Sequence, residues 1–321
     1  MTPIIQIYDL TKRYGKGSSS LVAVRSLNLQ VEEGEIFGFV GPNGAGKTST
    51  MRVMATLMEP TAGEVSIAGH SVRQAPREVR RITGFMPDYF GVYRDMLVWE
   101  YLDFFAACYD IPEAGRGALV DELLELVDLA HRRDDMLDGL SRGMKQHISL
   151  ARTLIHNPAV LILDEPASGL DPRARVEIRS LLVELSRMGK TIFFSTHILA
   201  DIAEICTRVG IIEAGELVAV GDLETLQQHL IPHRRIQVSL LGMQVKALEL
   251  LESMAGVENL QADPQRDNGR AVLGFDFTGD DSSLTSLLAR LVQEGIPVIE
   301  FRSDNRDMEE VFLRATKGLV T

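Results

Sequence analysis

The chain has 321 residues, a length that suits one large domain and a smaller one rather than a single small domain. Hydrophobic residues make up 45% and charged residues 24%, which excludes an intrinsically disordered chain and allows a sizeable core. The net charge of −12 and the absence of basic runs disfavour nucleic acid as a partner, because proteins that bind it usually show a basic patch.

The cysteines and the N-terminal segment bear on the cellular compartment. Cys108 and Cys206 lie far apart without a CxxC pattern, so we expect two reduced thiols rather than a zinc site or a disulfide framework. Residues 1–15 lack the ordered basic, apolar and small-residue regions of a signal peptide. No run approaches the roughly 20 apolar residues that span a bilayer. We therefore expect a cytoplasmic protein that reaches a membrane only by docking onto another protein.

The first predicted elements are strands. Short apolar runs alternate with polar turns over residues 4–40, which predicts strands at Ile4–Tyr8, Leu21–Leu29 and Ile36–Val40. The third strand leads directly into a glycine-rich loop. The segment after the loop contains no helix breaker and predicts a helix from Lys47 to about Leu57.

The glycine-rich loop satisfies a phosphate-binding pattern. Residues 41–48 read GPNGAGKT, a full match to G-x-x-x-x-G-K-S/T between a strand and a helix. Such a loop points backbone N–H groups at phosphate oxygens, and the start of the helix adds partial positive charge. Lys47 can reach the β- and γ-phosphates, and the Thr48 hydroxyl can ligate Mg²⁺. The residues expected to bind nucleotide here are Gly41, Pro42, Asn43, Gly44, Ala45, Gly46, Lys47, Thr48 and Ser49.

The middle of the chain changes from helical to alternating patterns. From about Trp99 to Leu129, apolar residues recur at helical spacing, which predicts a helical subdomain over about residues 92–155. The segments AVLILDEP, VEIRSLLVELSRMG, TIFFSTH and ILADIAEICT then read as strand, helix, strand and helix. This order implies a mostly parallel sheet covered by helices. The segment GIIEAGELVAVG predicts a hairpin that turns at Ala214 and Gly215.

The strand VLILDE ends in two acids. Asp164 is placed to hold Mg²⁺, and Glu165 is placed to polarise an attacking water as general base. Two acids at the end of a strand can also form a solvated turn. The four apolar residues before them and the phosphate-binding loop favour the chemical interpretation.

Over residues 4–230 these motifs resemble the ABC (ATP-binding cassette) ATPase family. The family signature LSGGQ is matched by LSRGM at residues 140–144, followed by KQHISLARTLIHNP and LDEPASGLDP in the family's order. In this family two cassettes enclose two ATP molecules. The resemblance therefore implies that Ser141 and Gly143, at a helix start, face the γ-phosphate bound by the other cassette.

The resemblance assigns further residues. Tyr14 matches the aromatic that stacks on adenine, Asp171 belongs to the SGLD segment that bridges the cassettes, and His197 matches the histidine that contacts the γ-phosphate. Asp88 stands where the family normally has glutamine. A carboxylate suits a hard cation, so we expect Asp88 to bind Mg²⁺, although it cannot donate a hydrogen bond. Arg142 replaces a glycine and can either add a cation near the phosphates or point to solvent.

The C-terminal part has a different pattern. The composition changes at Ile231 and Pro232, and the following segments read βαββαβ, which predicts a small ferredoxin-like α+β domain over residues 233–321. His233 stands alone, and no nucleophile–base pair or metal cluster accompanies it. We expect this domain to dimerise or to regulate. The predicted fold is α/β, a P-loop NTPase cassette with a mostly parallel core, an N-terminal antiparallel β subdomain and a helical subdomain, followed by this domain.

The resemblance implies an ATPase subunit of an ABC transporter. ATP and Mg²⁺ would be its ligands, and Lys47, Glu165 and His197 its catalytic residues. Dimerisation of cassettes around ATP would drive a separate integral membrane permease at the inner face of the cell membrane. A homodimer suffices because both halves of the composite site are present, and a heterodimer stays open.

The direction of transport and the alternatives rest on the same resemblance. The segments LSRGMK and MEEVFLRATKG resemble cassettes of bacterial drug, lipid or polysaccharide exporters. One alternative is a soluble ABC ATPase acting on ribosomes or nucleic acid, but such proteins usually carry two cassettes or a long coiled coil. A second alternative is a regulatory module with a slow ATPase, which the intact Glu165 disfavours. The sequence does not identify the transported substrate.

Overall fold

The computed structural model describes residues 3–15, 20–89, 91, 95–230, 234–263, 270–303, 312 and 315–316. The chain folds into two compact units, and the division falls between Leu223 and Glu224. Each unit has its own sheet and its own hydrophobic core.

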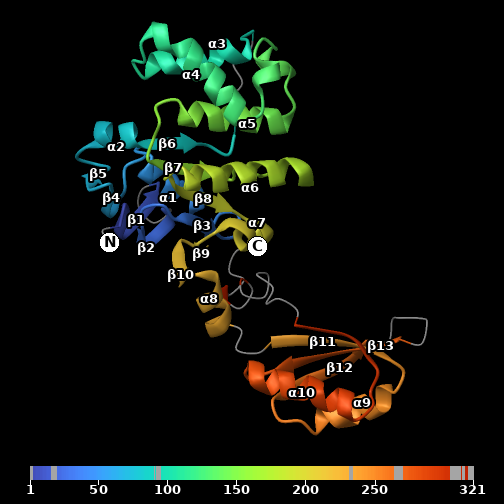
Figure 1. Cartoon of the computed structure of the whole chain (residues 1–321). Helices are drawn as coiled ribbons and strands as arrows, with labels where there is room; N and C mark the ends of the chain where they lie inside the picture. Colours follow the sequence, from blue (N-terminus) through green and yellow to red (C-terminus); the bar gives the residue numbers. More distant parts are fainter. Residues whose placement is uncertain are drawn as a thin grey trace. The chain divides into compact units, whose positions relative to one another are not determined.

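A mostly parallel sheet forms the centre of the first unit, with the strand order β10-β9-β3-β8-β7-β6 (Figure 1). Its strands are β3 Ile36–Val40, β6 Thr83–Met86, β7 Val160–Asp164, β8 Thr191–Thr196, β9 Arg208–Glu213 and β10 Glu216–Gly221. Strands β3, β7 and β8 are buried along their whole length, which explains their nearly continuous apolar sequences. The predicted hairpin is confirmed: β9 and β10 pair antiparallel around Ala214 and Gly215, both with positive φ.

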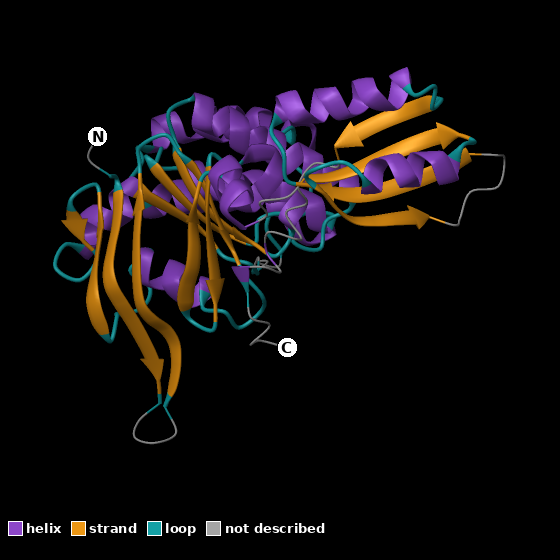
Figure 2. Ribbon diagram, turned by 90° about the horizontal axis from the view of Figure 1, so that it is seen from below, coloured by secondary structure: helices purple, strands orange, loops and turns teal. Residues whose placement is uncertain are grey.

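Helices flank this sheet. They are α1 Lys47–Met54, α2 Pro76–Ile82, α6 Pro172–Arg187 and α7 Leu199–Ile205. Figure 2 shows helices on both sides of the strands of this unit. Helix α1 ends before the predicted Leu57, because the chain turns at Thr56, which has a positive φ of 59°.

The predicted antiparallel N-terminal subdomain is a second sheet with the order β2-β1-β4-β5. Its strands are β1 Ile5–Tyr14, β2 Leu21–Val31, β4 Ala62–Ile67 and β5 His70–Ser71. Strand β1 is longer than predicted because register shifts after Ile7 and Leu10 interrupt its apolar alternation without ending the pairing with β2. These shifts carry β1 as far as Tyr14. Ile5, Ile7 and Leu10 join the same core as Phe37 and Met51.

The predicted helical subdomain consists of α3 Val98–Cys108, α4 Glu113–Leu126 and α5 Arg142–Leu154, with short 3₁₀ turns at Ala130–Arg132 and Leu137–Gly139. Buried Tyr101, Leu102, Leu124 and Ile148 hold the helices together. Across the described residues, no helix combines the length and the apolar character needed to cross a membrane.

The second unit has the ferredoxin-like topology expected from the sequence. After α8 Leu223–Leu230 come β11 Arg234–Leu241, α9 Gln244–Glu252, β12 Val257–Asp263, β13 Arg270–Phe277, α10 Asp281–Gln293 and β14 Val298–Ser303. The strands pair antiparallel in the order β12-β13-β11-β14, and α9 and α10 cover one face of the sheet (Figure 1). His233 and most of the segment MEEVFLRATKG lie outside the described residues.

Candidate active site

The phosphate-binding loop joins β3 to α1 and contacts the backbone of β2. Gly46 caps α1 with a φ of 109°, and a Cβ there would lie 2.4 Å from the carbonyl oxygen of Ala23. Only glycine combines this backbone conformation with so close an approach. The Lys47 amine donates to the carbonyl oxygens of Gly41 at 2.6 Å and Pro42 at 3.3 Å, so it is held across the loop.

A cavity of about 620 Å³ opens over this loop. Its lining residues are Tyr14, Leu21, Ala23, Pro42, Asn43, Gly44, Ala45, Gly46, Lys47, Thr48, Ser49, Asp88, Tyr89, Arg142, Glu165, Ser168 and His197. Segments far apart in the sequence therefore meet where the loop can hold phosphates. The cavity brings together most of the residues predicted to serve one nucleotide. Leu21, Ala23 and Tyr89 join them without having been predicted, and Ser168 comes from the SGLD segment that was expected to bridge two cassettes.

The two acids at the end of β7 are fixed by a residue that the sequence did not single out. The Ser195 hydroxyl donates to Asp164 Oδ1 at 2.6 Å and accepts from the Glu165 N–H at 3.0 Å. Ser195 lies directly opposite Asp164 in the parallel β7–β8 pair. Its position two residues before His197, at a strand end, was the only signal available in the sequence.

The Asp164 carboxyl group suits a divalent cation. Burial raises its pKa, the Ser195 hydroxyl opposes that rise, and the carboxylates of Asp88 and Glu165 add to it. Its Oδ2 atom is buried and has no hydrogen-bond partner among the described residues. An orphaned carboxylate oxygen beside further negative charge fits Mg²⁺, with the Thr48 hydroxyl and Asp88 as further oxygen donors.

No cluster of three or more His, Cys, Asp or Glu side chains suited to a metal occurs in the described parts of the chain. Mg²⁺ commonly binds through one or two carboxylates together with substrate phosphates, rather than in a cage made only of protein ligands. The donors around Asp164 fit that pattern.

Glu165 lies between two groups that can stabilise negative charge. One carboxylate oxygen is 2.8 Å from His197 Nδ1, and the other is 3.5 Å from the Lys47 amine. Because a carboxylate only accepts, Nδ1 carries the proton in this contact. Burial lowers the pKa of Lys47, and the Glu165 carboxylate opposes that effect. The arrangement places a carboxylate, an amine and an imidazole ring in contact beside the phosphate-binding loop.

Tyr14 lies at the end of β1, beside α1. Its hydroxyl shares a hydrogen bond of 3.1 Å with the Ser49 hydroxyl and also lies 3.1 Å from the Met58 sulfur. The Lys12 amine is 5.4 Å from the ring centroid. These contacts fix the ring at the rim of the cavity, where it remains partly exposed.

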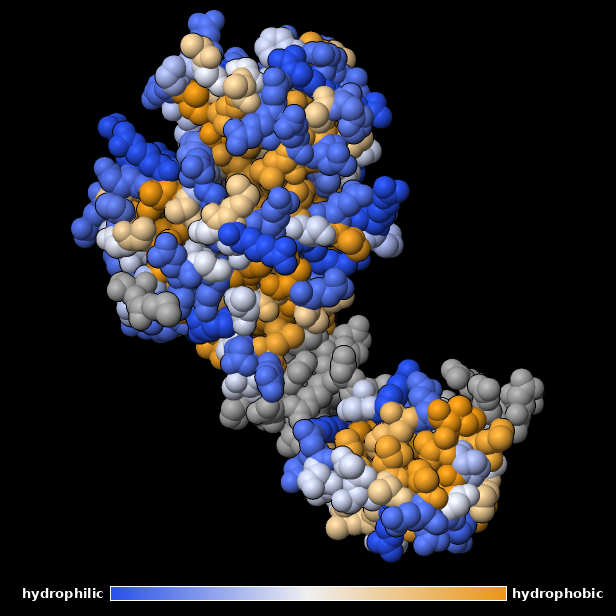
Figure 3. Space-filling model, viewed as in Figure 1, coloured by the Kyte–Doolittle hydropathy of each residue, from blue (hydrophilic) through white to orange (hydrophobic). Residues whose placement is uncertain are grey.

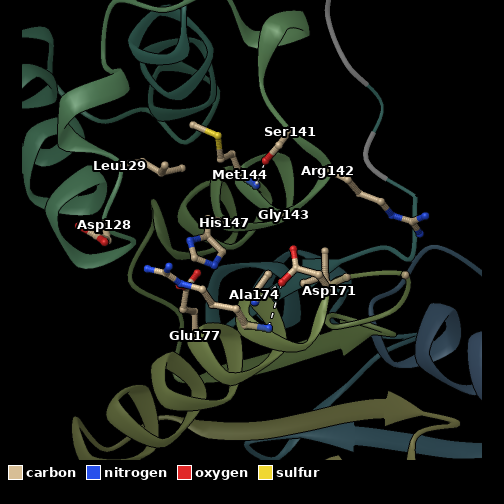
Figure 4. Close-up of a pocket in the computed structure, with 13 residues that line it drawn as sticks. Asp128, Leu129, Ser141, Arg142, Gly143, Met144, His147, Asp171, Ala174 and Glu177 are labelled. Carbon is tan, nitrogen blue, oxygen red and sulfur yellow. Dashed lines mark hydrogen bonds and ion pairs between the residues drawn. The ribbon is translucent and has the colours of Figure 1, made fainter.

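Three further predicted residues, Ser141, Gly143 and Asp171, line a second cavity of about 330 Å³, which Figure 4 shows. The Ser141 hydroxyl accepts from the Met144 N–H and caps α5, while the Asp171 carboxylate accepts from the N–H groups of Arg173 and Ala174 and caps α6. Ser141, Gly143 and Asp171 line this second cavity and not the first. Within one chain, the predicted residues thus form two separate groups.

Comparisons with known proteins give a consistent result. A family model described as ABC transporter matches residues 24–168. The chain is 33% identical to the bacitracin transport ATP-binding protein BcrA of Bacillus licheniformis, over 99% of each protein. It is also 33% identical to the Nod factor export ATP-binding protein I of Burkholderia orbicola, over 97% of this chain and 96% of that protein.

Solved structures agree on the fold of the first unit. The dimeric post-hydrolysis structure of the ATP-binding cassette MJ0796, bound to ADP and Pi, matches with a TM-score of 0.63 at 26% identity. The match covers 68% of this chain and 98% of that one. The cavity over the phosphate-binding loop therefore lies in a fold that this chain shares with a cassette whose structure holds ADP and Pi.

Proposed function

The chain belongs to the ABC transporter family as an ATP-binding subunit that hydrolyses ATP, and we propose that it drives export through a separate integral membrane permease. The observation that carries this proposal is the match along nearly the whole chain to ATP-binding subunits named for bacitracin transport and Nod factor export.

In the proposed reaction, Glu165 orients a water in line with the γ-phosphate and accepts its proton. The carboxylate lines the cavity together with the phosphate-binding loop, and its contacts with His197 and Lys47 hold it in place there. Lys47 and His197 stabilise the charge that develops on the γ-phosphate oxygens. Tyr14 stacks on the base at the rim.

We assign Mg²⁺ to the donors of Thr48, Asp164 and Asp88. The unpartnered Oδ2 atom of Asp164 supports this assignment. When bound, Mg²⁺ would neutralise part of the negative charge on the phosphate oxygens.

The active form is proposed to be a dimer that encloses nucleotide between two chains. The separation of Ser141, Gly143 and Asp171 from the P-loop cavity supports this arrangement, because those residues can serve a nucleotide held by a partner. The partial positive charge at the start of α5 favours a phosphate at Ser141 and Gly143. Hydrolysis would remove the phosphate that both chains hold and let them separate, moving the permease between two conformations.

We propose a homodimer at the inner face of the cell membrane, because one chain carries both groups of residues, and a heterodimer stays open. We assign the C-terminal domain, residues 233–321, a dimerising or regulatory role. Figure 3 shows hydrophobic residues gathered on one face of the second unit. The exposed apolar side chains of the second unit include Leu241, Val245 and Val292. Dimerisation and regulation that survive removal of residues 233–321 would count against this role.

The test of the transport proposal is co-purification. The Glu165→Gln variant, isolated in MgATP from detergent-solubilised membranes of its own organism, should bring a multi-span membrane protein at stoichiometric ratio. The Lys47→Ala variant, which removes the amine expected to bind the phosphates, serves as the control. It should bring down less of the same membrane protein than Glu165→Gln does. Recovery of only ribosomal proteins or nucleic acid would contradict the proposal.

A further inference from the structure

His197 is held largely through the backbone around it, where β8 passes into α7. Its side chain is 48% exposed, so packing alone does not fix the ring. The N–H of the next residue, Ile198, donates to the Thr196 hydroxyl at 2.9 Å, and the Ile198 carbonyl oxygen accepts from the Asp201 N–H at 3.2 Å. The position of the ring therefore depends on the end of β8 and on the first turn of α7.

Two contacts of different kinds fix α7 in the first unit. The first is apolar: a Cβ on Gly38 of β3 would lie 2.4 Å from Ile202 Cδ1 and 2.6 Å from Cys206 Sγ, so these two side chains pack on the bare glycine. The second is polar: the Arg179 guanidinium of α6 donates to Asp201 Oδ1 at 3.1 Å. Apolar burial holds the helix against the sheet but has no direction, whereas a charge-assisted hydrogen bond also fixes the rotation of the helix.

The ion pair between Asp201 and Arg179 is buried. The Asp201 side chain is 2% exposed and that of Arg179 is 13% exposed. Burial raises the pKa of Asp201, and the charges of Arg179 and Arg175, both on α6, oppose that rise. Because a buried carboxylate is costly without a cation beside it, the ion pair keeps this turn of α7 against α6.

We propose that Asp201 is a positioning residue for ATP hydrolysis, which acts through α7 to hold the His197 ring against Glu165. The inference rests on the proposed function, in which Glu165 activates water and His197 stabilises charge on the γ-phosphate. His197 Nδ1 lies 2.8 Å from the Glu165 carboxylate, and this contact requires the turn that carries the ring to keep its place. A displacement of about 1 Å in a reacting group can lower a catalytic rate about 100-fold.

Asp201 acts from outside the nucleotide cavity. Among the described residues that line the cavity over the phosphate-binding loop are Lys47 and His197, but neither Asp201 nor Arg179. Loss of the ion pair should therefore leave the phosphate-binding groups in place. The rate of the chemical step should fall while the binding of MgATP is kept.

The experiment is steady-state ATP hydrolysis by the full chain, with kcat and KM for MgATP determined separately. Asp201→Asn should lower kcat about 10–100-fold and leave KM within about twofold, because the ring is displaced while the loop is not. Asp201→Glu keeps a carboxylate beside Arg179 and should recover most of kcat. Arg179→Gln removes the same ion pair from α6 and should reproduce the loss, so the test does not depend on the folding of one variant.

Glu204→Gln is the matched control. Glu204 also lies on α7 and also pairs with Arg179 at 3.1 Å. Its side chain is 56% exposed, so water screens the pair and kcat should stay within about twofold of the unmutated value.

A double substitution shows whether Asp201 acts through His197. In a His197→Ala background, Asp201→Asn should lower the residual rate, followed in single turnovers with radiolabelled ATP, by no more than about twofold, because the ring that it positions is absent. An unchanged kcat for Asp201→Asn, an equal loss for Glu204→Gln, or an undiminished loss in the His197→Ala background would overturn the proposal for Asp201. Failure of the unmutated chain to hydrolyse ATP would instead overturn the proposed function.

Discussion

Ser195→Ala tests whether one buried hydroxyl organises the two acids at the end of β7. Ser195 is fully buried, donates to Asp164 and accepts from the Glu165 N–H. Losing a hydrogen bond to a charged group costs about 1.5–3 kcal/mol, and leaving a buried N–H unsatisfied costs about 1–3 kcal/mol. We expect a loss of about 3 kcal/mol in the free energy of unfolding, or about 6–12 °C in the melting temperature of a unit of this size.

The pH dependence of that loss has a definite sign. The folded-state pKa of Asp164 is already raised by burial, and the Ser195 hydroxyl holds it down. Removing Ser195 raises the pKa of Asp164 further, so the variant loses the most free energy of unfolding at pH values where Asp164 is ionised. As the pH falls through the folded-state pKa, Asp164 takes up a proton and the difference between the two proteins narrows. Urea unfolding of the nucleotide-free protein at neutral and acidic pH measures this change.

Ser149→Ala is the matched control. Ser149 is also fully buried, in α5, but its hydroxyl has no hydrogen-bond partner among the described residues. Its removal should cost well under about 1 kcal/mol. Equal losses of free energy of unfolding for Ser149→Ala and Ser195→Ala, or a loss for Ser195→Ala that does not change with pH, would contradict the proposed role of the Ser195 hydroxyl.

Three further changes test other parts of the first unit. Arg179→Met removes the cation 3.1 Å from the buried Asp201 carboxylate, whose pKa burial already raises, and should lower the free energy of unfolding in urea by about 3 kcal/mol at neutral pH and by less in acid. A loss that does not change with pH would argue against this role of Arg179. Tyr14→Ala should weaken ATP binding about tenfold in a fluorescent-nucleotide titration while Tyr14→Phe does not, and equal effects would exclude stacking. Asp88→Ala should raise the Mg²⁺ concentration needed for half-maximal ATPase activity, whereas an unchanged Mg²⁺ dependence would remove Asp88 from the metal site.

Much of the fold followed from the periodicity of the sequence. The continuous apolar runs of β3, β7 and β8 identified the buried parallel core, and the βαββαβ order identified the second unit. Short strands such as β5 and β6 were not predicted, because a run of two or four residues carries no period. The end of β1 was also missed, because bulges break the alternation while the pairing continues.

The candidate site was predictable where a local motif fixes its chemistry. The loop around Lys47 and the acids Asp164 and Glu165 are each contained in one short segment and need no tertiary contact to be noticed. Ser195 acts through the register of β7 against β8, and Arg142, at the start of α5, lies against Gly169 in the loop before α6. Neither contact leaves a periodic pattern in the sequence, so neither could be predicted before the fold was known.

The central claim is that Glu165 activates water in an ATP site completed by a second chain. The most direct measurement combines steady-state ATP hydrolysis by Glu165→Gln with its sedimentation in MgATP. We expect a rate about 10²–10⁴-fold below that of the unmutated protein, together with a stable ATP-dependent dimer. Hydrolysis near the unmutated rate, or a chain that remains monomeric in saturating MgATP, would contradict it.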